Sequence, residues 1–144
     1  SALFDVGDHV AVASASYPCY RNVLAALGCA PVHVAINSAF KLTARELHAE
    51  IERRARAQLK PLRGVVLSTP SNPTGAVLSA SELHVLVELC ERSGTFLIID
   101  EIYRGLTFES FDTAYHEPSS ESDVSDTAAA PSAALYVARG SPVV

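Results

Sequence analysis

Short runs of aliphatic and β-branched residues alternate with helical patterns along most of the chain. Four of these runs are typical of strands, at residues 9–13, 31–36, 64–68 and 95–99. The last run is continuously apolar, which predicts a strand that is buried on both faces. Strands that alternate with helices form βαβ units, and such units build parallel sheets. We therefore predict a three-layer α/β domain in which helices flank a mostly parallel sheet.

Three segments between these strands carry helix signals. The first begins at Pro18 and ends at Gly28, and Tyr20 lies on its apolar face, so we interpret Tyr20 as a core residue. The other two begin with capping-box pairs, in which a hydroxyl side chain is followed three residues later by glutamate. These pairs are Thr43 with Glu46 and Ser79 with Glu82.

The periodic pattern fails after Phe108. Residues 109–132 contain six acidic residues and no Lys or Arg, and they are rich in Ser and Ala. This composition is typical of a flexible, solvated loop. We predict three parts along the chain: a sheet domain at 1–108, an acidic loop at 109–132, and a terminal segment at 133–144 with a last strand at 134–138.

Composition narrows the class of protein. Apolar residues make up 49% of the chain and charged residues 19%, as in globular proteins. The formal net charge of -5 gives no electrostatic reason to expect a nucleic-acid partner. The three cysteines and five histidines lack metal-ligand spacing, and no segment has the length of a membrane span or the pattern of a leader. We therefore expect a cytoplasmic protein without a metal site.

Polar or aromatic residues directly follow three of the predicted strands. Ser16-Tyr17-Pro18 follows the first strand, residues 69–75 follow the third, and residues 100–103 follow the fourth. In an open α/β sheet, ligands bind beyond the carboxyl ends of the strands. Because parallel strands end at the same edge, we expect these groups to line one crevice that binds a small molecule.

Four stretches carry a family resemblance: Asp5-Val6-Gly7-Asp8, Tyr17-Pro18-Cys19-Tyr20, Ser71-Asn72-Pro73-Thr74-Gly75 and Asp100-Glu101-Ile102-Tyr103. Their order and spacing over residues 1–108 resemble those of class I/II aminotransferases, which are pyridoxal-phosphate enzymes of the aspartate aminotransferase fold type. The resemblance implies that the chain is a central piece of the large, cofactor-binding domain. It also implies pyridoxal 5'-phosphate as cofactor, an amino acid and a 2-oxo acid as substrates, and a homodimeric full-length protein.

The resemblance implies cofactor-binding roles for four residues. Asp100 resembles the aspartate that pairs with the pyridine nitrogen, where a carboxylate makes the ring a better electron sink. Asn72 and Tyr103 resemble the residues that hydrogen-bond the phenolic oxygen of the cofactor, and Tyr17 resembles the aromatic residue that stacks on the ring. The structural alternatives are a strand-end turn for Asp100, a turn residue for Asn72 and a buried tyrosine for Tyr103.

The lysine that forms the Schiff base in this family is absent from the chain. In the family it follows the strand after the Asp-Glu-Ile-Tyr motif, and this chain ends three residues after Ser141. The only lysines, Lys41 and Lys60, are not placed to reach the crevice, so we assign no catalytic residue. The chain has no Met and begins at Ser1. We interpret it as a fragment whose phosphate cradle lies upstream and which is inactive in transamination alone.

Three other functions remain open to different degrees. A pyridoxal-phosphate-dependent lyase or synthase of the same family would carry the same motifs. A non-catalytic interaction module would keep the fold and use the acidic loop as its contact surface. A dinucleotide-binding domain is disfavoured, because no Gly-x-Gly-x-x-Gly pattern follows the first strand. We interpret Glu101 and Arg104 as surface or structural pairing residues.

Overall fold

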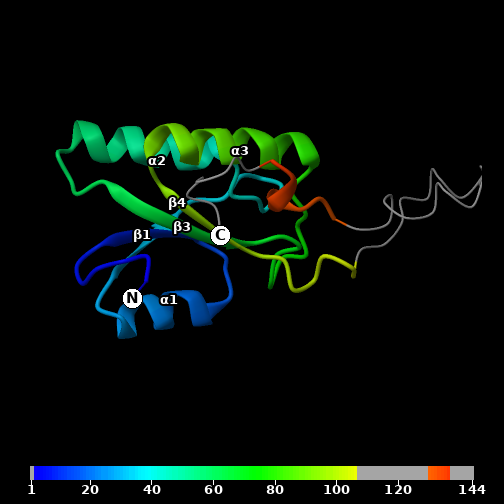
Figure 1. Ribbon diagram of the computed structural model, residues 1–144, viewed down its shortest axis with the longest axis horizontal. Coiled ribbons are helices and arrows are strands. Elements are labelled where there is room, and N and C mark those ends of the chain that lie inside the picture. The colour runs from blue at the N-terminus through cyan, green and yellow to red at the C-terminus, as the bar shows by residue number, and fades with distance from the viewer. Residues whose placement is uncertain (1, 107–129, 137–144) are drawn as a thin grey trace, which may run out of the picture.

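The computed structural model describes residues 2–106 and 130–136. Its centre is a four-stranded sheet in the order β2-β1-β3-β4, and each neighbouring pair of strands is parallel (Figure 1). The strands are β1 (His9–Ala13), β2 (Ala30–Val34), β3 (Leu62–Ser68) and β4 (Phe96–Asp100). The predicted α/β fold with a parallel sheet is confirmed, and all four strands form at the predicted hydrophobic runs.

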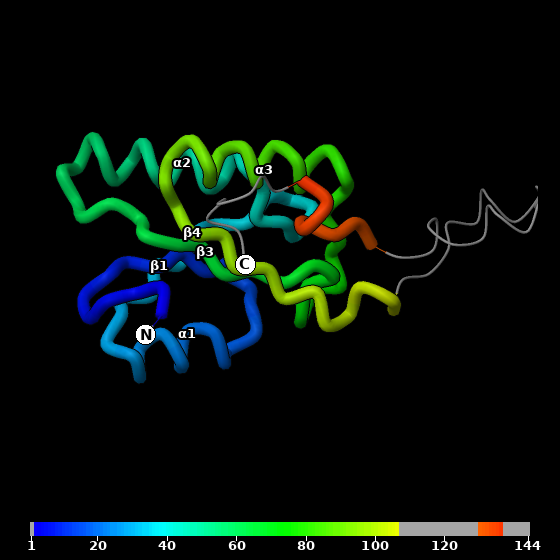
Figure 2. Tube along the Cα trace, in the orientation of Figure 1, coloured from blue at the N-terminus to red at the C-terminus, as the bar shows by residue number. Residues whose placement is uncertain are grey.

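Three long helices flank the sheet: α1 (Pro18–Ala26), α2 (Ala44–Arg56) and α3 (Ala80–Ser93). α1 covers one face, and α2 and α3 lie side by side on the other (Figure 1, Figure 2). Both predicted capping boxes form: the side chains of Thr43 and Ser79 accept hydrogen bonds from backbone amides of the first turn, and the carboxylates of Glu46 and Glu82 accept hydrogen bonds from the amides of Thr43 and Ser79. α3 ends at Gly94, whose φ of 64° is a left-handed conformation that glycine adopts without a Cβ clash.

Two apolar layers form because successive side chains of a strand point to opposite faces of the sheet. On the α2 and α3 side, apolar residues of β1, β3 and β4 pack with apolar residues of α3: Ala11, Val65, Leu67, Leu97, Leu83, Leu86, Val87 and Cys90. On the α1 side, a smaller cluster holds Phe4, Val10, Val12, Leu24, Cys29 and Val66. β1 and β3 therefore contribute to both layers and form the centre of the sheet.

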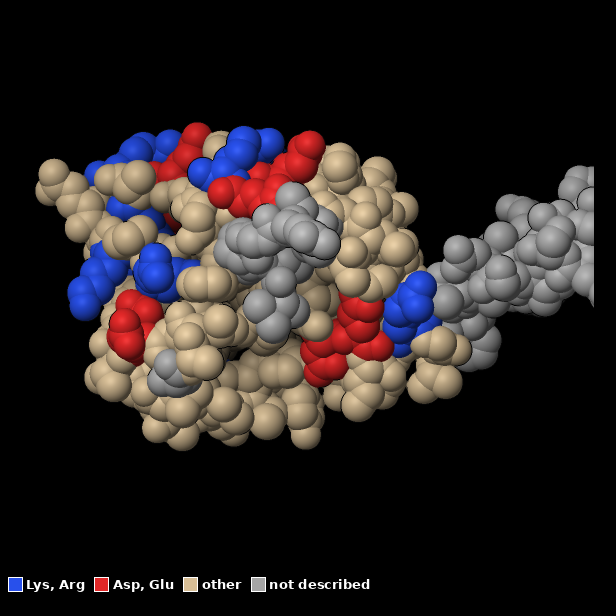
Figure 3. All heavy atoms as spheres, in the orientation of Figure 1, with Lys and Arg blue, Asp and Glu red and all other residues tan. Residues whose placement is uncertain are grey.

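The α1 side of the sheet is only half covered. α1 packs against β1 and β2, and no described helix lies over β3 and β4 on that side. Val23 and Leu27 of α1 stay 49% and 44% exposed and line an apolar groove of about 360 Å³ that also includes Ile98 of β4. The prediction that the fourth strand is buried on both faces is therefore wrong, since only Leu97 of β4 is fully buried. Figure 3 shows charged residues gathered over α2 and α3 and few around α1.

Residues 130–136 dock on the turn that follows β4. The Arg104 side chain donates to the carbonyl oxygen of Ala130 at 2.8 Å, and the Glu101 carboxylate accepts from the amide of Ala133 at 2.8 Å. Both side chains therefore have the structural pairing role that the sequence predicts.

Ala133–Leu135 form a 3-10 helix where the sequence predicts the start of a strand over residues 134–138. The Ser132 hydroxyl accepts a hydrogen bond from the amide of Ala134, and such a local bond favours a helical turn over an extended chain. The end of that predicted strand and most of the predicted acidic loop lie outside the described residues. Within the described ranges, no helix has the length and apolar character needed to cross a membrane.

Candidate functional site

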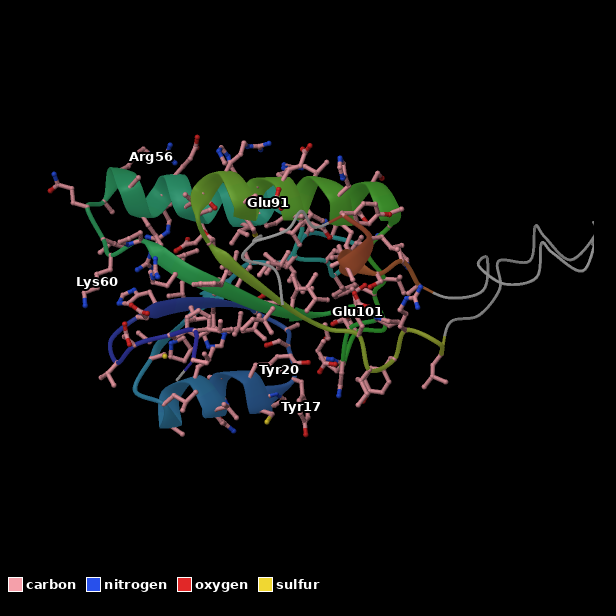
Figure 4. The ribbon with its side chains drawn as sticks, in the orientation of Figure 1. Tyr17, Tyr20, Arg56, Lys60, Glu91 and Glu101 are labelled. Carbon is pink, nitrogen blue, oxygen red and sulfur yellow. The ribbon has the colours of Figure 1, made fainter. Side chains whose placement is uncertain are left out.

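The centre of the sheet contains a topological switch point. α1 follows β1 on one face, and α3 follows β3 on the other, although β1 and β3 are neighbours. A crevice between strands of this kind, at their carboxyl ends, is where open α/β sheets bind ligands. Figure 4 shows Tyr17, Tyr20 and Glu101 toward this end of the molecule, and Lys60 at the opposite end.

Asp100 is the last residue of β4 and is half-buried at this edge. Its Oδ2 accepts a hydrogen bond from the Tyr20 hydroxyl at 2.7 Å, and its Oδ1 accepts one from the amide of Ile102 at 3.0 Å. Within the described ranges, no Lys, Arg or His forms an ion pair with this carboxylate. Asp100 is thus a rigidly held acceptor whose negative charge has no cationic partner in the described fold.

Tyr20 has a polar role in addition to the core position that the helical pattern predicts. Its ring packs edge-on against Tyr17, with centroids 5.9 Å apart, while its hydroxyl donates to Asp100. Burial and the hydrogen bond to Asp100 raise the pKa of Tyr20 to about 12, against a smaller opposing effect of the Ser68 hydroxyl. The hydroxyl therefore stays protonated near neutral pH and remains a donor. The sequence signal was present: Tyr20 is the second tyrosine of the Tyr17-Pro18-Cys19-Tyr20 motif.

Asn72 is presented by a tightly built loop that follows β3. The buried Thr69 hydroxyl accepts from the amide of Leu78 at 2.9 Å, which closes the base of the loop. Gly75 lets the chain turn back toward the sheet, because its φ of 69° is a left-handed conformation that glycine adopts easily. The backbone amide of Asn72 donates to Ser68 Oγ at 3.3 Å. These hydrogen bonds fix the backbone position of Asn72 at the edge of the sheet.

Asn72 and Tyr103 line one groove of about 530 Å³, together with Pro70, Pro73 and Leu106. This volume lies within the range of small-molecule sites. Tyr103 is 37% exposed, and the described residues offer no hydrogen-bonding partner to its hydroxyl or to the side-chain amide of Asn72. These two polar groups are therefore available to a ligand.

The four residues predicted from the sequence all lie at the carboxyl edge, but in two groups. Asn72 and Tyr103 share the groove. Tyr17 and Asp100 do not line it and are instead connected through Tyr20, which touches both. Tyr17 is 46% exposed, so part of this residue is accessible to a ligand.

The two lysines lie at different edges of the sheet. Lys41 lines a small cavity of about 20 Å³ at the carboxyl edge, beside Ser16 and Ser68, so it lies closer to the crevice than the sequence predicts. Its ammonium forms an ion pair with Glu82 at 2.9 Å. Lys60 follows α2 at the opposite edge (Figure 4).

A parallel sheet with polar side chains at the carboxyl edge of its switch point is the arrangement in which open α/β domains bind ligands. The family described as aminotransferase class I and II matches residues 1–137, and the chain belongs to this family. Enzymes of this family generally depend on pyridoxal phosphate. The family resemblance predicted from the four sequence motifs is confirmed.

Individual relatives agree with this assignment. The chain is 46% identical over 110 residues to the valine–pyruvate aminotransferase of Mycobacterium tuberculosis, covering 75% of this chain and 26% of that protein. It is 31% identical over 111 residues to the 1-aminocyclopropane-1-carboxylate synthase of Malus domestica, covering 75% of this chain and 23% of that protein. A crystal structure of an aminotransferase from Mycobacterium tuberculosis matches with a TM-score of 0.67 at 46% identity, over 76% of this chain and 27% of that one. The chain thus spans about a quarter of each of these proteins.

Proposed function

We propose that the chain forms the ring-recognition part of a pyridoxal-phosphate site in an aminotransferase, which moves an amino group between an amino acid and a 2-oxo acid. The observation that carries this proposal is the Asp100 carboxylate. It is held by Tyr20 and by the Ile102 amide at the carboxyl edge, without a cationic partner in the described fold. A half-buried carboxylate that two donors hold in place can form a charge-assisted hydrogen bond with a positively charged group. A protonated pyridine nitrogen is such a group.

The remaining donors and acceptors fit the other parts of the same ring. The Asn72 amide and the Tyr103 hydroxyl are both available at one groove and would hydrogen-bond the phenolic oxygen. The exposed ring of Tyr17 would stack on the pyridine face. When bound, pyridoxal phosphate supplies an electron sink for a carbanion. Asp100 would favour the protonated ring nitrogen, and Tyr20 would hold Asp100 in place.

Neither lysine is assigned a catalytic role. The Lys41 ammonium is bound to Glu82 at 2.9 Å, and Lys60 lies at the opposite edge of the sheet. We therefore propose that the residues of this chain bind the cofactor ring without a covalent bond to it.

A titration with pyridoxamine 5'-phosphate tests the proposal, because this form of the cofactor has no aldehyde and cannot react with lysine. Asp100→Asn keeps the shape of the side chain and removes its charge, so we expect the affinity to fall by at least about tenfold, or about 1.4 kcal/mol. Asp5→Asn is the matched control, because Asp5 is an exposed aspartate at the opposite edge. Equal affinities of the wild type and Asp100→Asn, measured by fluorescence or calorimetry, would overturn the assignment of Asp100.

A second candidate is a lyase or synthase reaction on an amino acid, because the Malus domestica relative carries the name of a synthase. The two candidates share the ring-recognition residues of this chain. They differ in the second substrate, since only an aminotransferase needs a 2-oxo acid. Product formation by the full-length protein from an amino acid alone would favour the synthase, and a strict requirement for pyruvate or another 2-oxo acid would favour the aminotransferase.

A further inference from the structure

The turn that carries Tyr103 is not anchored by burial of its own apolar side chains. It lies within residues 101–106, where Ile102 and Leu106 are 73% and 74% exposed. Tyr103 is 37% exposed, and its hydroxyl has no hydrogen-bonding partner among the described residues. The place of this hydroxyl in the groove therefore depends on how the backbone of the turn is held.

Hydrogen bonds within the turn set its local shape. The amide of Arg104 donates to the carbonyl oxygen of Glu101 at 2.9 Å, and the amide of Leu106 donates to the carbonyl oxygen of Tyr103 at 2.8 Å. Each of these bonds joins residues three positions apart. They define the bend of the backbone, but they do not attach the turn to the rest of the fold.

A segment that lies much later in the sequence holds the turn at two points. Arg104 and Ala130 exchange two hydrogen bonds: the amide of Ala130 donates to the carbonyl oxygen of Arg104 at 3.1 Å, and Arg104 Nε donates to the carbonyl oxygen of Ala130 at 2.8 Å. The Glu101 carboxylate accepts from the amide of Ala133 at 2.8 Å, and Figure 4 shows Glu101 next to the 3-10 helix. The two points lie on either side of the tyrosine in the sequence.

This later segment is itself attached to the body of the fold. Ala130 and Ala133 are 4% and 3% exposed, and Ala133 belongs to the apolar layer that includes α3. The ring of Tyr136 packs edge-on against His84 of α3, with centroids 5.4 Å apart. Contacts therefore run from α3 through this segment to the turn.

We propose that Glu101 and Arg104 are positioning residues for Tyr103. By binding the turn to residues 130–136, they fix the Tyr103 hydroxyl relative to Asn72, the other ligand-accessible polar group of the groove. The proposal rests on the proposed function, because it treats Tyr103 and Asn72 as partners of one phenolic oxygen. Two donors that are held at a fixed separation bind one acceptor without a further cost of ordering them.

The alternative is a surface pairing that adds stability without reaching the groove. Glu101→Gln and Glu101→Ala separate the two roles, because glutamine keeps a carbonyl oxygen that can accept from the amide of Ala133 and alanine does not. Glu52→Ala is the matched control, since Glu52 is a half-exposed glutamate that pairs with Arg56 on α2. A positioning role requires loss of function in Glu101→Ala and recovery in Glu101→Gln.

NMR relaxation of the 144-residue chain tests the positioning without any ligand. We expect a backbone order parameter at Tyr103 of about 0.85 in the wild type, in Glu101→Gln and in Glu52→Ala, and below about 0.6 in Glu101→Ala. If Glu101→Ala unfolds the chain, Arg104→Met removes the donor to Ala130, keeps an unbranched side chain and carries the same test. A Tyr103 order parameter that stays at the wild-type value in Glu101→Ala or Arg104→Met, or that does not recover in Glu101→Gln, would overturn the proposal.

A binding cycle with pyridoxamine 5'-phosphate then asks whether the positioning reaches the ligand. We expect Glu101→Ala to weaken binding about fivefold and Glu101→Gln to stay within about twofold of the wild type. In the Tyr103→Phe background the hydroxyl is gone, so Glu101→Ala should cause less than about a twofold further loss. A fivefold loss in both backgrounds would show that Glu101 acts by another route and would contradict the proposal. Failure of the wild type to bind the ligand contradicts the proposed function instead, while the order parameters still decide the role of Glu101 and Arg104.

Discussion

His9 begins β1 at the edge opposite the candidate site, and its imidazole faces a buried guanidinium. Arg54 is 5% exposed; it hydrogen-bonds Nδ1 of His9 and donates from Nε to the carbonyl oxygen of Lys60 at 2.8 Å. Its Nη1 also lies 3.5 Å from Glu50. Because Nδ1 accepts from a cation, the imidazole is neutral and carries its proton on Nε2. Burial, Arg54 and Lys60 lower the pKa of His9 below 6.5, and Asp8 opposes them in part.

This environment predicts a loss of stability in mild acid. The unfolded chain binds a proton at His9 near pH 6.5, whereas the folded chain resists it, so the free energy of unfolding falls as the pH drops through about 6.5. The slope from this one group is at most about 1.4 kcal/mol per pH unit. His9→Asn, which keeps an acceptor for Arg54, should flatten the difference between urea unfolding at pH 7.5 and at pH 5.5. His33→Asn is the control, since His33 is exposed on β2; an identical pH dependence in both variants would contradict the assignment.

At the scale of elements, the amino end of α3 links two segments of the fold. Ser79 Oγ accepts from the amide of Glu82 at 3.2 Å, and Glu82 Oε2 accepts from the amide of Ser79 at 2.7 Å. Glu82 also accepts a hydrogen bond from the ammonium of Lys41, which lies in the loop before α2. Burial would raise the pKa of Glu82, but the hydrogen bonds from Lys41 and Ser79 outweigh burial and lower it. The capping box therefore fixes the start of α3 and ties it to the loop that precedes α2.

Removing the cap should destabilise the whole chain by a measurable amount. Ser79→Ala leaves the amide of Glu82 without its acceptor, and such a change costs about 1 kcal/mol of folding free energy. Urea unfolding followed by circular dichroism measures the loss. Ser38→Ala, at an exposed loop position, should change the stability by less than about 0.5 kcal/mol. A cap variant as stable as this control would show that the start of α3 frays without consequence.

At the scale of the whole molecule, the two sides of the sheet differ. Two helices that carry most of the visible charge cover one side, and α1 alone covers the other (Figure 1, Figure 3). The apolar groove of about 360 Å³ lies beside α1, and Val23 and Leu27 form part of its rim. An exposed apolar surface of this kind binds other apolar groups.

The groove should therefore bind a hydrophobic dye. We expect the folded chain to enhance the fluorescence of anilinonaphthalene sulfonate, and Leu27→Lys to remove most of this enhancement by placing a charge at the rim. Val85→Lys is the matched control, because Val85 is 47% exposed on α3, away from the groove. Equal enhancement in Leu27→Lys and Val85→Lys would show that the dye binds elsewhere.

Short-range sequence signals predicted the starts of α2 and α3 correctly. The capping boxes at Thr43 and Ser79 form as predicted, because each needs only residues three positions apart. The pattern failed over residues 133–135, where the Ser132 hydroxyl stabilises a 3-10 turn that competes with the predicted strand.

The sequence by itself determined the parallel α/β class, the positions of four strands and three helices, and the placement of Tyr17, Asn72, Asp100 and Tyr103 at one edge. Parallel strands force this last result, because their carboxyl ends meet. Only the tertiary structure decided that Tyr20 donates to Asp100, that the Asn72 amide donates to Ser68, and that half of one sheet face lacks a described helix. Residues 20 and 100 meet only because β1, β3 and β4 lie side by side in one sheet and α1 packs on β1 and β2. A contact between residues that are far apart in the sequence depends on that packing, and the periodic pattern of the sequence does not predict it.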